Sequence, residues 1–329
     1  MTRKAPGRSH RKGLTVMELL RMFPDNAAAE RWFEDQRWGK SGRFCPDCGS
    51  CNTATVASRK PMPYRCRDCR AHFSVRKGTV MQSSKLGLQK WAIALYMMTT
   101  GIKGTSSMKL YREVGIRQGT AWFLMQRIRE AFNEGASLPF PGPVEVDETY
   151  MGGKRKNMSN AKRRQLAKEG AGRGSVGKVA VVGAKDRATK QVTAKVVQET
   201  DKPTLQGFVK ETAAPGATVY TDEATAYSGL PFDHETVKHS VSEYVRGMAH
   251  TNGIESFWSM FERGFHGTFH KMSPKHLNRY VQEFAGRNNI RDMDTIAQMT
   301  AMVRQMEGKR LRYVDLIADN GLDSGARSA

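Results

Sequence analysis

The sequence has no uninterrupted apolar run that approaches the ~18 residues needed to span a membrane. Its N-terminal residues are basic, and residues 14–20 carry a charge and lead into more charged sequence, which argues against a signal peptide. No internal repeat is found. These absences favour a soluble globular protein of the cytoplasm.

Acidic residues are scarce relative to basic ones. The chain has 32 Asp and Glu against 53 Lys and Arg, a formal net charge of +21. Such a charge favours a polyanionic partner, although nucleic acids, membrane surfaces and ribosomes would all satisfy it. Hydrophobic residues make up 39% of the 329 residues, which is enough for two or three domains with buried cores. The charge therefore indicates a class of partner and no activity.

Cysteine is also rare, yet four of the five cysteines form two Cys-x-x-Cys pairs with 17 residues between them. Each pair places two thiolates on a tight turn, and two such turns close a tetrahedral site for one structural Zn²⁺. Disulfides are the alternative, which the absence of an export signal disfavours. Cys51 has no assigned role, and the predicted zinc ligands are Cys45, Cys48, Cys66 and Cys69.

The first part of the chain is expected to hold three small segments. Residues 1–40 predict a basic tail and two short helices, residues 41–82 a zinc ribbon, and residues 83–138 a helical domain. In the last segment a short helix, a turn at 115–119 and a helix at 120–132 indicate a helix-turn-helix, whose last helix could enter a major groove. A small bundle that only joins domains is the alternative. The side chains expected inside are Ala121, Leu124, Ile128 and Phe132, and those expected outside are Gln126, Arg127 and Arg129.

A proline-rich linker at residues 139–143 separates these segments from a second domain at 144–295. Three antiparallel strands followed by alternating helices and strands predict an α/β fold with a mixed sheet and flanking helices. Residues 296–329 are expected to form a C-terminal helix and a disordered tail. The expected strands are 144–150, 178–185, 190–198, 217–221 and 234–239, and the expected helices are 204–212, 223–228, 252–262 and one starting at Ser273.

Three acidic residues occupy positions where α/β sheets collect their functional groups. Asp147 lies in the first strand, Asp222 ends the fourth, and Glu255 lies near the start of a later helix. Period-two alternation places Asp147 on the same face as Glu145. Carboxylates brought together repel one another unless a cation lies among them, and two Mg²⁺ ions, or Mn²⁺ in their place, would suit oxygen ligands. Solvation explains each acid taken alone, but their order along the chain indicates a metal site.

These acids and the order of the elements resemble the ribonuclease-H-like fold of DDE transposases and retroviral-type integrases. More narrowly, the chain resembles the insertion-sequence transposases with an N-terminal zinc ribbon, the ISXO-like group, over roughly residues 14–295. The motifs that carry the resemblance are Arg37-Trp38 before Cys45-Pro46-Asp47-Cys48-Gly49, Val146-Asp147-Glu148-Thr149-Tyr150-Met151-Gly152-Gly153-Lys154, Tyr220-Thr221-Asp222, His250-Thr251-Asn252-Gly253-Ile254-Glu255-Ser256-Phe257-Trp258, and Ser273-Pro274-Lys275-His276-Leu277-Asn278-Arg279-Tyr280.

The resemblance implies that Asp147, Asp222 and Glu255 are the Mg²⁺ ligands. Asn252 belongs to the same motif and could help to hold a metal or a phosphate, with helix capping as the alternative. The family pattern places a basic residue two helical turns after the final acid. Glu262 occupies that neighbourhood here, and Arg263 could substitute for the missing base.

The implied activity is that of a DNA transposase, which binds the terminal inverted repeats of its element, cuts at the element ends and joins the 3′-hydroxyl to target DNA by two-metal phosphoryl transfer. Joining two ends implies a homo-oligomer on double-stranded DNA, in the cytoplasm and associated with the nucleoid. A basic insertion at 153–177, beside the first strand, is expected to grip phosphates. The expected DNA contacts are Lys154, Arg155, Lys156, Arg163, Arg164, Arg127 and Arg263.

Two other functions stay open on the sequence alone. One is a zinc-ribbon regulator that descends from a transposase and has lost catalysis; the intact acids argue against it, whereas Glu262 favours it. The other is a ribonuclease-H-like nuclease that cleaves RNA–DNA hybrids, against which the N-terminal DNA-reading segments argue.

Overall fold

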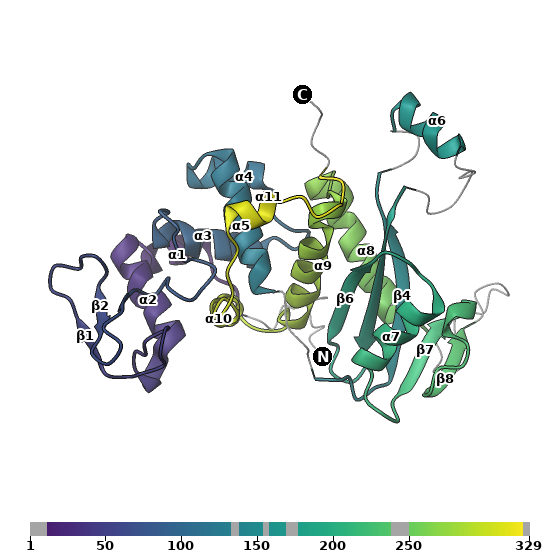
Figure 1. Ribbon diagram of the computed structural model, residues 1–329, viewed down its shortest axis with the longest axis horizontal. Helices are drawn as coiled ribbons and strands as arrows, with labels where there is room; N and C mark the ends of the chain where they lie inside the picture. The colour runs from purple at the N-terminus through teal and green to yellow at the C-terminus, as the bar shows by residue number, and fades with distance from the viewer. Residues whose placement is uncertain (1–11, 133–137, 154–157, 169–176, 238–249, 325–329) are drawn as a thin grey trace, which may run out of the picture. The chain divides into compact units, whose positions relative to one another are not determined.

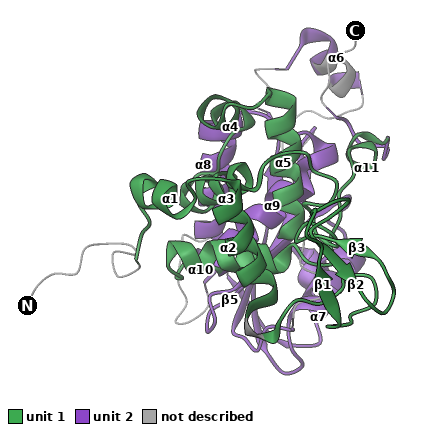
Figure 2. Cartoon of the chain, turned by 90° about the vertical axis from the view of Figure 1, so that its left-hand side faces the viewer, with its two compact units in different colours: residues 1–133, 290–318 green, residues 134–289, 319–329 purple. Residues whose placement is uncertain are grey.

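The chain leaves its first structural unit at residue 133 and returns to it at residue 290 (Figure 1). Unit 1 comprises residues 1–133 and 290–318, and unit 2 comprises residues 134–289 and 319–329 (Figure 2). The computed structural model describes residues 12–132, 138–153, 158–168, 177–237 and 250–324. Within these ranges, no helix combines the length and apolar character needed to cross a bilayer.

Unit 1 begins with two helices whose first N–H groups are satisfied by side chains. Thr15 and Glu18 form a reciprocal capping box at the start of α1 (Val16–Met22), and Asp25 accepts a 2.7 Å hydrogen bond from the Ala28 N–H at the start of α2 (Asn26–Trp38). A short 3-10 turn, η1 (Gly39–Ser41), ends α2. These caps fix where both helices start.

A small antiparallel sheet follows, in the order β1-β2-β3. Its strands are β1 (Thr53–Thr55), β2 (Tyr64–Cys66) and β3 (His72–Phe73). The strands are only two or three residues long, so backbone pairing alone cannot stabilise the sheet. Its stability must come from packing and from whatever binds the cysteines at its turns.

The helices α3 (Leu88–Thr100), α4 (Ser107–Val114) and α5 (Gln118–Ala131) form the middle of unit 1. Ser106 caps α4, and Gly115 ends it in the left-handed conformation with φ 65°, which a glycine adopts without steric cost. Only residues 115–117 separate α4 from α5, so the two helices form the compact pair expected of a helix-turn-helix. The four side chains predicted inside this pair, Ala121, Leu124, Ile128 and Phe132, are all buried.

The predicted outward orientation of the other α5 side chains is wrong. Gln126, Arg127 and Arg129 are 0, 8 and 2% exposed. Arg127 lies over the Phe123 ring, and its Nε donates to the carbonyl oxygen of Leu311 at 3.1 Å. Residues 290–318, the segment that returns to unit 1, include α10 (Thr295–Gln305) and α11 (Tyr313–Ile317). This segment covers the face of α5 that the sequence pattern predicted to be exposed to solvent.

One hydrophobic cluster runs through unit 1. It contains Trp38 and Phe73 around the small sheet, Leu95 and Leu124 from the helices, and Met302 from the returning segment. The segments that the sequence analysis treated as a zinc ribbon and a helical domain thus share one core. Because that core includes α10, unit 1 cannot be complete without residues 290–318.

Unit 2 contains a mixed five-stranded sheet in the order β6-β5-β4-β7-β8, which confirms the predicted α/β class with a mixed sheet (Figure 1). The first three strands along the chain pair antiparallel, whereas β7 and β8 run parallel to β4. The strand bounds are β4 (Val144–Met151), β5 (Val179–Asp186), β6 (Val192–Val197), β7 (Thr218–Asp222) and β8 (Asp233–Val237).

Helices pack on both faces of this sheet. One face buries α7 (Lys202–Thr212) and the short η3 (Thr225–Tyr227), and the other buries α8 (Asn252–Gly264), a π-helical turn (Phe265–Phe269) and α9 (Pro274–Asn289). A further helix, α6 (Asn160–Lys168), lies between β4 and β5 in the sequence. Alternate residues of β4 therefore enter two different cores, which decides where the acids of that strand point.

Side-chain amides of α9 take the place of a neighbouring strand at the edge formed by β6. Asn289 accepts from the Val192 N–H at 2.8 Å and donates to the Val192 carbonyl at 2.9 Å. Gln282 donates to the Ala194 carbonyl at 2.8 Å, and Asn278 accepts from the Val196 N–H at 3.1 Å. An open sheet edge would invite pairing with another chain, and these amides close it.

Replacing Asn289 with alanine should remove two hydrogen bonds from the edge of β6 and destabilise unit 2 by about 1–3 kcal/mol. Asn278→Ala, which removes a single contact from an exposed position, should cost less. Urea denaturation gives both free energies of unfolding, and hydrogen exchange of the Val192 amide reports the edge directly. Equal effects of the two variants would contradict this account of the edge.

Candidate active site

The acids of β4 are divided between the two faces of the sheet. Val144 and Val146 enter the core with α7, so Glu148 belongs to that face. Glu145 and Asp147 belong to the opposite face, where Glu145 accepts a hydrogen bond from the Ile254 N–H of α8 at 2.8 Å. The prediction that Asp147 shares a face with Glu145 fits this arrangement.

A gap opens between β4 and β7 at the position of these acids. The two strands pair only at Val144–Val219 and Glu145–Tyr220, although β7 continues to Asp222 and β4 to Met151. Side chains from both faces of the sheet can enter such a gap. Ligand oxygens of Asp147, Glu148 and Asp222 all lie within 4.8 Å of one another there.

The electrostatics of this group reflect burial and the mutual repulsion of its carboxylates. Burial raises the pKa of Asp147 to about 6, the Glu148 backbone N–H opposes the rise, and the Asp222 and Glu255 carboxylates add to it. Burial also raises the pKa of Glu148 to about 7. The hydrogen bond from Tyr227 lowers this pKa, whereas repulsion from the Asp222 and Asp147 carboxylates raises it. A divalent cation among these oxygens would remove the repulsion, because each carboxylate binds it in the charged form.

Glu148 is a member of this group that the sequence analysis did not propose. The hydroxyl of Tyr227 donates to Glu148 Oε1, and Tyr227 is fully buried in the core between η3 and α7. Burial raises the pKa of Tyr227, and the neighbouring Glu148 carboxylate raises it further, so the phenol keeps its proton and remains a donor. Alternation along the strand predicted Glu148 on the face away from Asp147, and only the gap between β4 and β7 reveals that both can reach one site.

The third predicted ligand, Glu255, lies near this group without belonging to it. Its carboxylate contributes to the raised pKa of Asp147, but Oε1 accepts a 2.7 Å hydrogen bond from the Thr251 hydroxyl. Glu255 is exposed, as is Asn252 at the first position of α8. The structure thus brings Asp147 and Asp222 together as predicted and places Glu255 beside them, on the first turn of α8.

The start of α8 is held by buried charges instead of a capping side chain of its own. Glu145, 1% exposed, accepts from the Ile254 N–H and pairs with Arg187, whose Nε lies 2.6 Å from Oε1. Lys185 donates to the Gly253 carbonyl at 2.9 Å. A Cβ at Gly253 would lie 2.5 Å from Glu145 Oε2, so this position requires glycine. These contacts fix the helix turn that carries Glu255.

Asp147 is held close to α8 by a second glycine. Gly183 of β5 is the strand partner of Asp147, and a Cβ at Gly183 would lie 2.6 Å from the Trp258 ring. The indole fills the space that a side chain would occupy, and it acts to lower the pKa of Asp147. Close packing of the helix against the strand therefore depends on this missing side chain.

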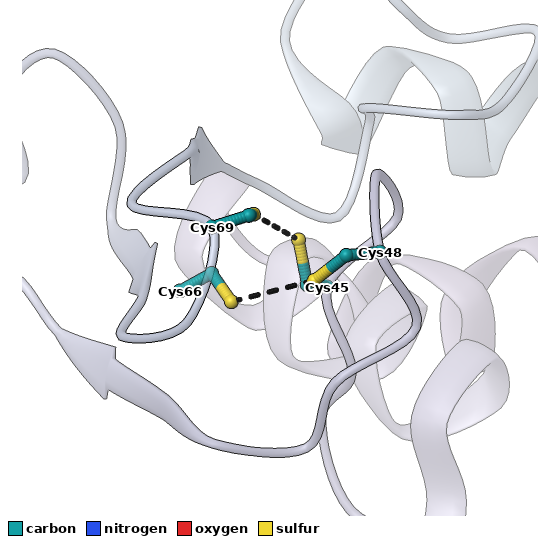
Figure 3. A group of neighbouring side chains, drawn as sticks. All are labelled: Cys45, Cys48, Cys66 and Cys69. Carbon is teal, nitrogen blue, oxygen red and sulfur yellow. Dashed lines mark hydrogen bonds between the residues drawn. The ribbon is translucent and has the colours of Figure 1, made fainter.

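The four predicted cysteine ligands come together in unit 1 (Figure 3). The Sγ atoms of Cys45 and Cys69 are 3.6 Å apart, and those of Cys48 and Cys66 are 3.7 Å apart. Four sulfurs at ~2.3 Å from a central zinc ion would be separated by roughly 3.8 Å in a tetrahedron. Disulfides require ~2.05 Å. The spacing therefore fits a metal site and excludes disulfide bonds among these four thiols.

Local hydrogen bonds prepare the cysteine group for a cation. The Cys69 backbone N–H is the main cause that lowers the pKa of the Cys66 thiol to about 7. The Ala71 backbone N–H acts in the same direction on Cys69, but burial and three neighbouring thiols raise its pKa to about 12. Four thiolates cannot coexist at this distance unless a cation binds them. Zn²⁺ is the ion that this donor set fits.

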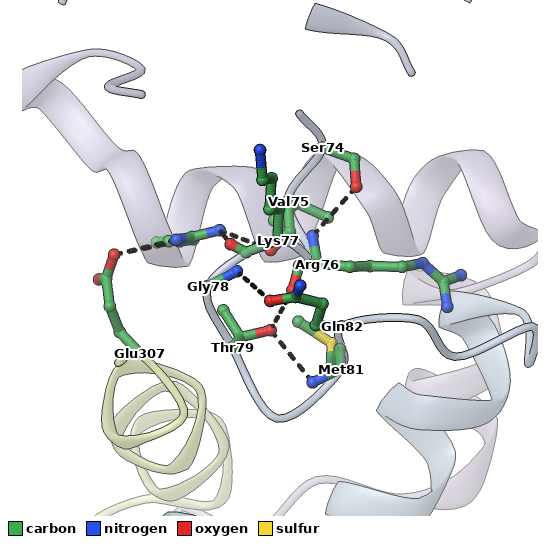
Figure 4. Close-up of polar contacts among 10 residues, drawn as sticks. Ser74, Val75, Arg76, Lys77, Gly78, Thr79, Met81, Gln82 and Glu307 are labelled. Atoms are coloured by element: carbon green, nitrogen blue, oxygen red, sulfur yellow. Dashed lines mark hydrogen bonds and ion pairs between the residues drawn. The ribbon is translucent and has the colours of Figure 1, made fainter. Parts of the chain in front are cut away.

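The loop that follows β3 forms hydrogen bonds with other parts of unit 1, and Figure 4 shows its polar contacts. Arg37 donates to the carbonyl oxygens of Val75 at 2.8 Å and Lys77 at 2.7 Å, and it forms a 3.1 Å ion pair with Glu307. Lys77 in turn pairs with Asp47 between the first two cysteines. The helix α2, the loop and the returning segment therefore position the first cysteine pair together.

Residues 139–289 match the family model of the ISXO2-like transposase domain. The matched residues lie in unit 2 and are named here the ISXO2-like domain. A curated relative, an uncharacterized protein in transposable element ISH50 of Halobacterium salinarum, is 28% identical over 284 residues, which cover 83% of this chain and 94% of the relative. These matches confirm the resemblance to insertion-sequence transposases drawn from the sequence motifs.

The ISXO2-like domain begins just before β4 and ends with the last residue of α9. It therefore contains the carboxylate group, the start of α8 and the edge formed by β6. The cysteine group and the helices α3, α4 and α5 precede it in the chain. The relative from the transposable element matches over most of its length, so its similarity is not confined to the matched domain.

The predicted DNA contacts of the ISXO2-like domain and its neighbours divide into three kinds. Arg163 and Arg164 are exposed on α6, and Arg263 is exposed on α8 with Nε donating to the Ser259 carbonyl. Arg127 is buried in unit 1 and is not available to a phosphate. Lys154, Arg155 and Lys156 lie outside the described residues.

Purified protein should contain one zinc ion per chain, bound by the four clustered thiols. Replacing Cys66 with serine should remove most of the zinc and destabilise unit 1, because Phe73 and Trp38 pack around that sheet. Cys51→Ser is the matched control, since Cys51 is exposed and outside the cluster. Metal content measured by atomic emission tests this; full zinc occupancy in the Cys66 variant would refute the assignment.

Proposed function

We propose that this chain is the transposase of an insertion sequence, which binds the terminal inverted repeats, cuts at the element ends and joins the 3′-hydroxyl to target DNA. The observation that carries this proposal is the carboxylate group in the gap between β4 and β7 of an ISXO2-like domain. The strand order, with three antiparallel and two parallel strands, supports the ribonuclease-H-like fold that the proposal requires.

Asp147 and Asp222 would hold the catalytic cations, and Glu255 would complete the set from α8. Asn252, one turn earlier on the same helix, would assist with a metal or a phosphate. Two Mg²⁺ ions, once bound, would activate the attacking oxygen and stabilise the leaving oxygen. Glu145 and Arg187 contribute by fixing the helix turn from which Glu255 reaches the site.

The proposed reaction has two in-line steps. In the first, a water oxygen attacks the phosphorus at the element end, and the bond to the 3′ oxygen breaks. In the second, that 3′-hydroxyl attacks a phosphodiester of the target, the bond from this phosphorus to the target's own 3′ oxygen breaks, and the target strand leaves with a 3′-hydroxyl, so that one phosphate ester is exchanged for another. Such a reaction requires no covalent intermediate with the protein.

Unit 1 would recognise the element ends. In a helix-turn-helix, the first residues of the second helix read base edges. Arg117, Gln118 and Thr120, at the start of α5, are exposed and suit this role, in contrast to the buried Arg127. Arg65, Arg67 and Arg70 are also exposed around the second cysteine pair and would contact phosphates. Joining two ends requires at least two copies of the chain on the DNA.

Asp147→Asn should abolish Mg²⁺-dependent nicking and strand transfer while end binding persists, because the substitution removes a ligand charge and preserves the size of the side chain. Supercoiled and oligonucleotide assays with element-end DNA measure both activities. Unchanged strand transfer would refute the assignment. A wild-type chain that binds ends but never nicks would instead indicate the catalytically inactive regulator, and preferential cleavage of RNA–DNA hybrids would indicate the nuclease.

The two exposed arginines of α6 should contribute to DNA affinity through phosphates. Arg163→Ala together with Arg164→Ala should weaken binding and make the salt dependence of log K shallower by about 2. Arg127→Ala removes the same kind of charge from a buried position. It should leave the salt dependence unchanged and lower the free energy of unfolding by roughly 1–3 kcal/mol. The reverse pattern would contradict the assignment of exposed and buried roles.

A further inference from the structure

Strand β4 carries two glutamates that lie close to the sheet core but differ in how their charges are balanced. Glu145 has a protein cation, since Arg187 Nε lies 2.6 Å from its Oε1. Glu148 has none: in the described part of the chain, no ion pair involves Glu148, Asp147 or Asp222. A half-buried carboxylate without a cation nearby is unfavourable in its charged form, so a bound cation would stabilise the Glu148 carboxylate.

The hydrogen bond from Tyr227 to the Glu148 side chain selects an orientation for the carboxylate. The Tyr227 hydroxyl donates to Oε1, which leaves Oε2 without a bond to Tyr227. Tyr227 itself is 0% exposed and packs with Leu205, Phe208 and Val146 in the core, so its ring has little freedom to move. A rigid donor on one oxygen is how proteins commonly orient a carboxylate that binds a metal with the other.

The gap between β4 and β7 brings this carboxylate to the proposed metal site from the opposite side of the sheet. Asp147 approaches from the face covered by α8, Glu148 approaches from the face covered by α7 and η3, and Asp222 ends the neighbouring strand. Their ligand oxygens lie within 4.8 Å of one another, a separation that a single hard divalent cation can bridge.

We propose that Glu148 is a further carboxylate ligand of the Mg²⁺ or Mn²⁺ site, in addition to Asp147, Asp222 and Glu255, and that Tyr227 positions it. The proposal rests on the proposed function, because it places Glu148 at the same cation site. Glu148, the acid that follows Asp147, would contact the metal directly. Tyr227, which is buried and lies outside the acidic group, would hold Glu148 in place.

Titration of the full chain with Mn²⁺, followed by the electron paramagnetic resonance signal of the free ion, measures the affinity without any DNA reaction. Glu148→Gln should weaken Mn²⁺ binding tenfold or more, and Tyr227→Phe should weaken it by about tenfold. Glu148→Gln keeps an amide oxygen that can accept the Tyr227 hydrogen bond, so its fold should be preserved. Urea midpoints and circular dichroism establish that each variant is folded.

Two variants test whether Glu148 binds the metal directly or only attracts it through the electrostatic field of its charge. Glu148→Asp keeps the charge but shortens the side chain, and Tyr227→Phe changes no charge at all. Both should weaken Mn²⁺ binding if Glu148 is a positioned ligand. Wild-type affinity in both variants would overturn the proposal, even if Glu148→Gln binds more weakly. Glu211→Gln, an exposed acid on α7 paired with Lys195, is the matched control and should bind as wild type.

Asp147→Asn distinguishes failure of this inference from failure of the proposed function. If Asp147→Asn loses Mn²⁺ binding and the Glu148 and Tyr227 variants do not, the metal site stands and the role of Glu148 is refuted. If wild type and Asp147→Asn bind Mn²⁺ equally, or neither binds it, the carboxylate group is not the metal site and both proposals fall.

Discussion

Repulsion among carboxylates that the described chain does not neutralise is the constraint on which the proposed site depends. Asp147, Glu148 and Asp222 crowd into a gap between two strands, and burial together with their mutual repulsion raises the pKa values of the first two. A fold built only for stability would pair or separate such groups, as unit 2 does with Glu145 and Arg187. This crowding of carboxylates therefore fits a binding site for the cations that the proposed reaction requires.

The rest of unit 2 keeps this gap in place. The antiparallel pairing of β4, β5 and β6 makes one rigid side, and the amides of α9 close its outer edge. Glycines at positions 183 and 253 allow α8 to approach the sheet closely, so that the Trp258 ring packs against Gly183, the strand partner of Asp147, and the Ile254 N–H donates to Glu145. The site is consequently supported by contacts between segments about 40 to 110 residues apart in the chain, such as Glu145 with Arg187 and with Ile254.

Features set by local spacing could be predicted from the sequence. The two Cys-x-x-Cys pairs come together with sulfur separations that suit one ion, and the strands and helices of unit 2 occur in the predicted order. Alternation along β4 fits the observed face of Asp147. Long-range contacts escaped prediction: Arg127 is buried because residues 290–318 return to unit 1, and Glu148 joins the acidic group because β4 and β7 stop pairing. Neither event has a signature within the segment that it affects.

Diffraction from crystals grown with Mn²⁺, measured where manganese scatters anomalously, tests the central claim most directly. The account predicts anomalous density between β4 and β7, with the ion about 2.0–2.2 Å from carboxylate oxygens of Asp147 and Asp222. Anomalous density elsewhere in unit 2, with these carboxylates bound only to protein groups, would contradict it.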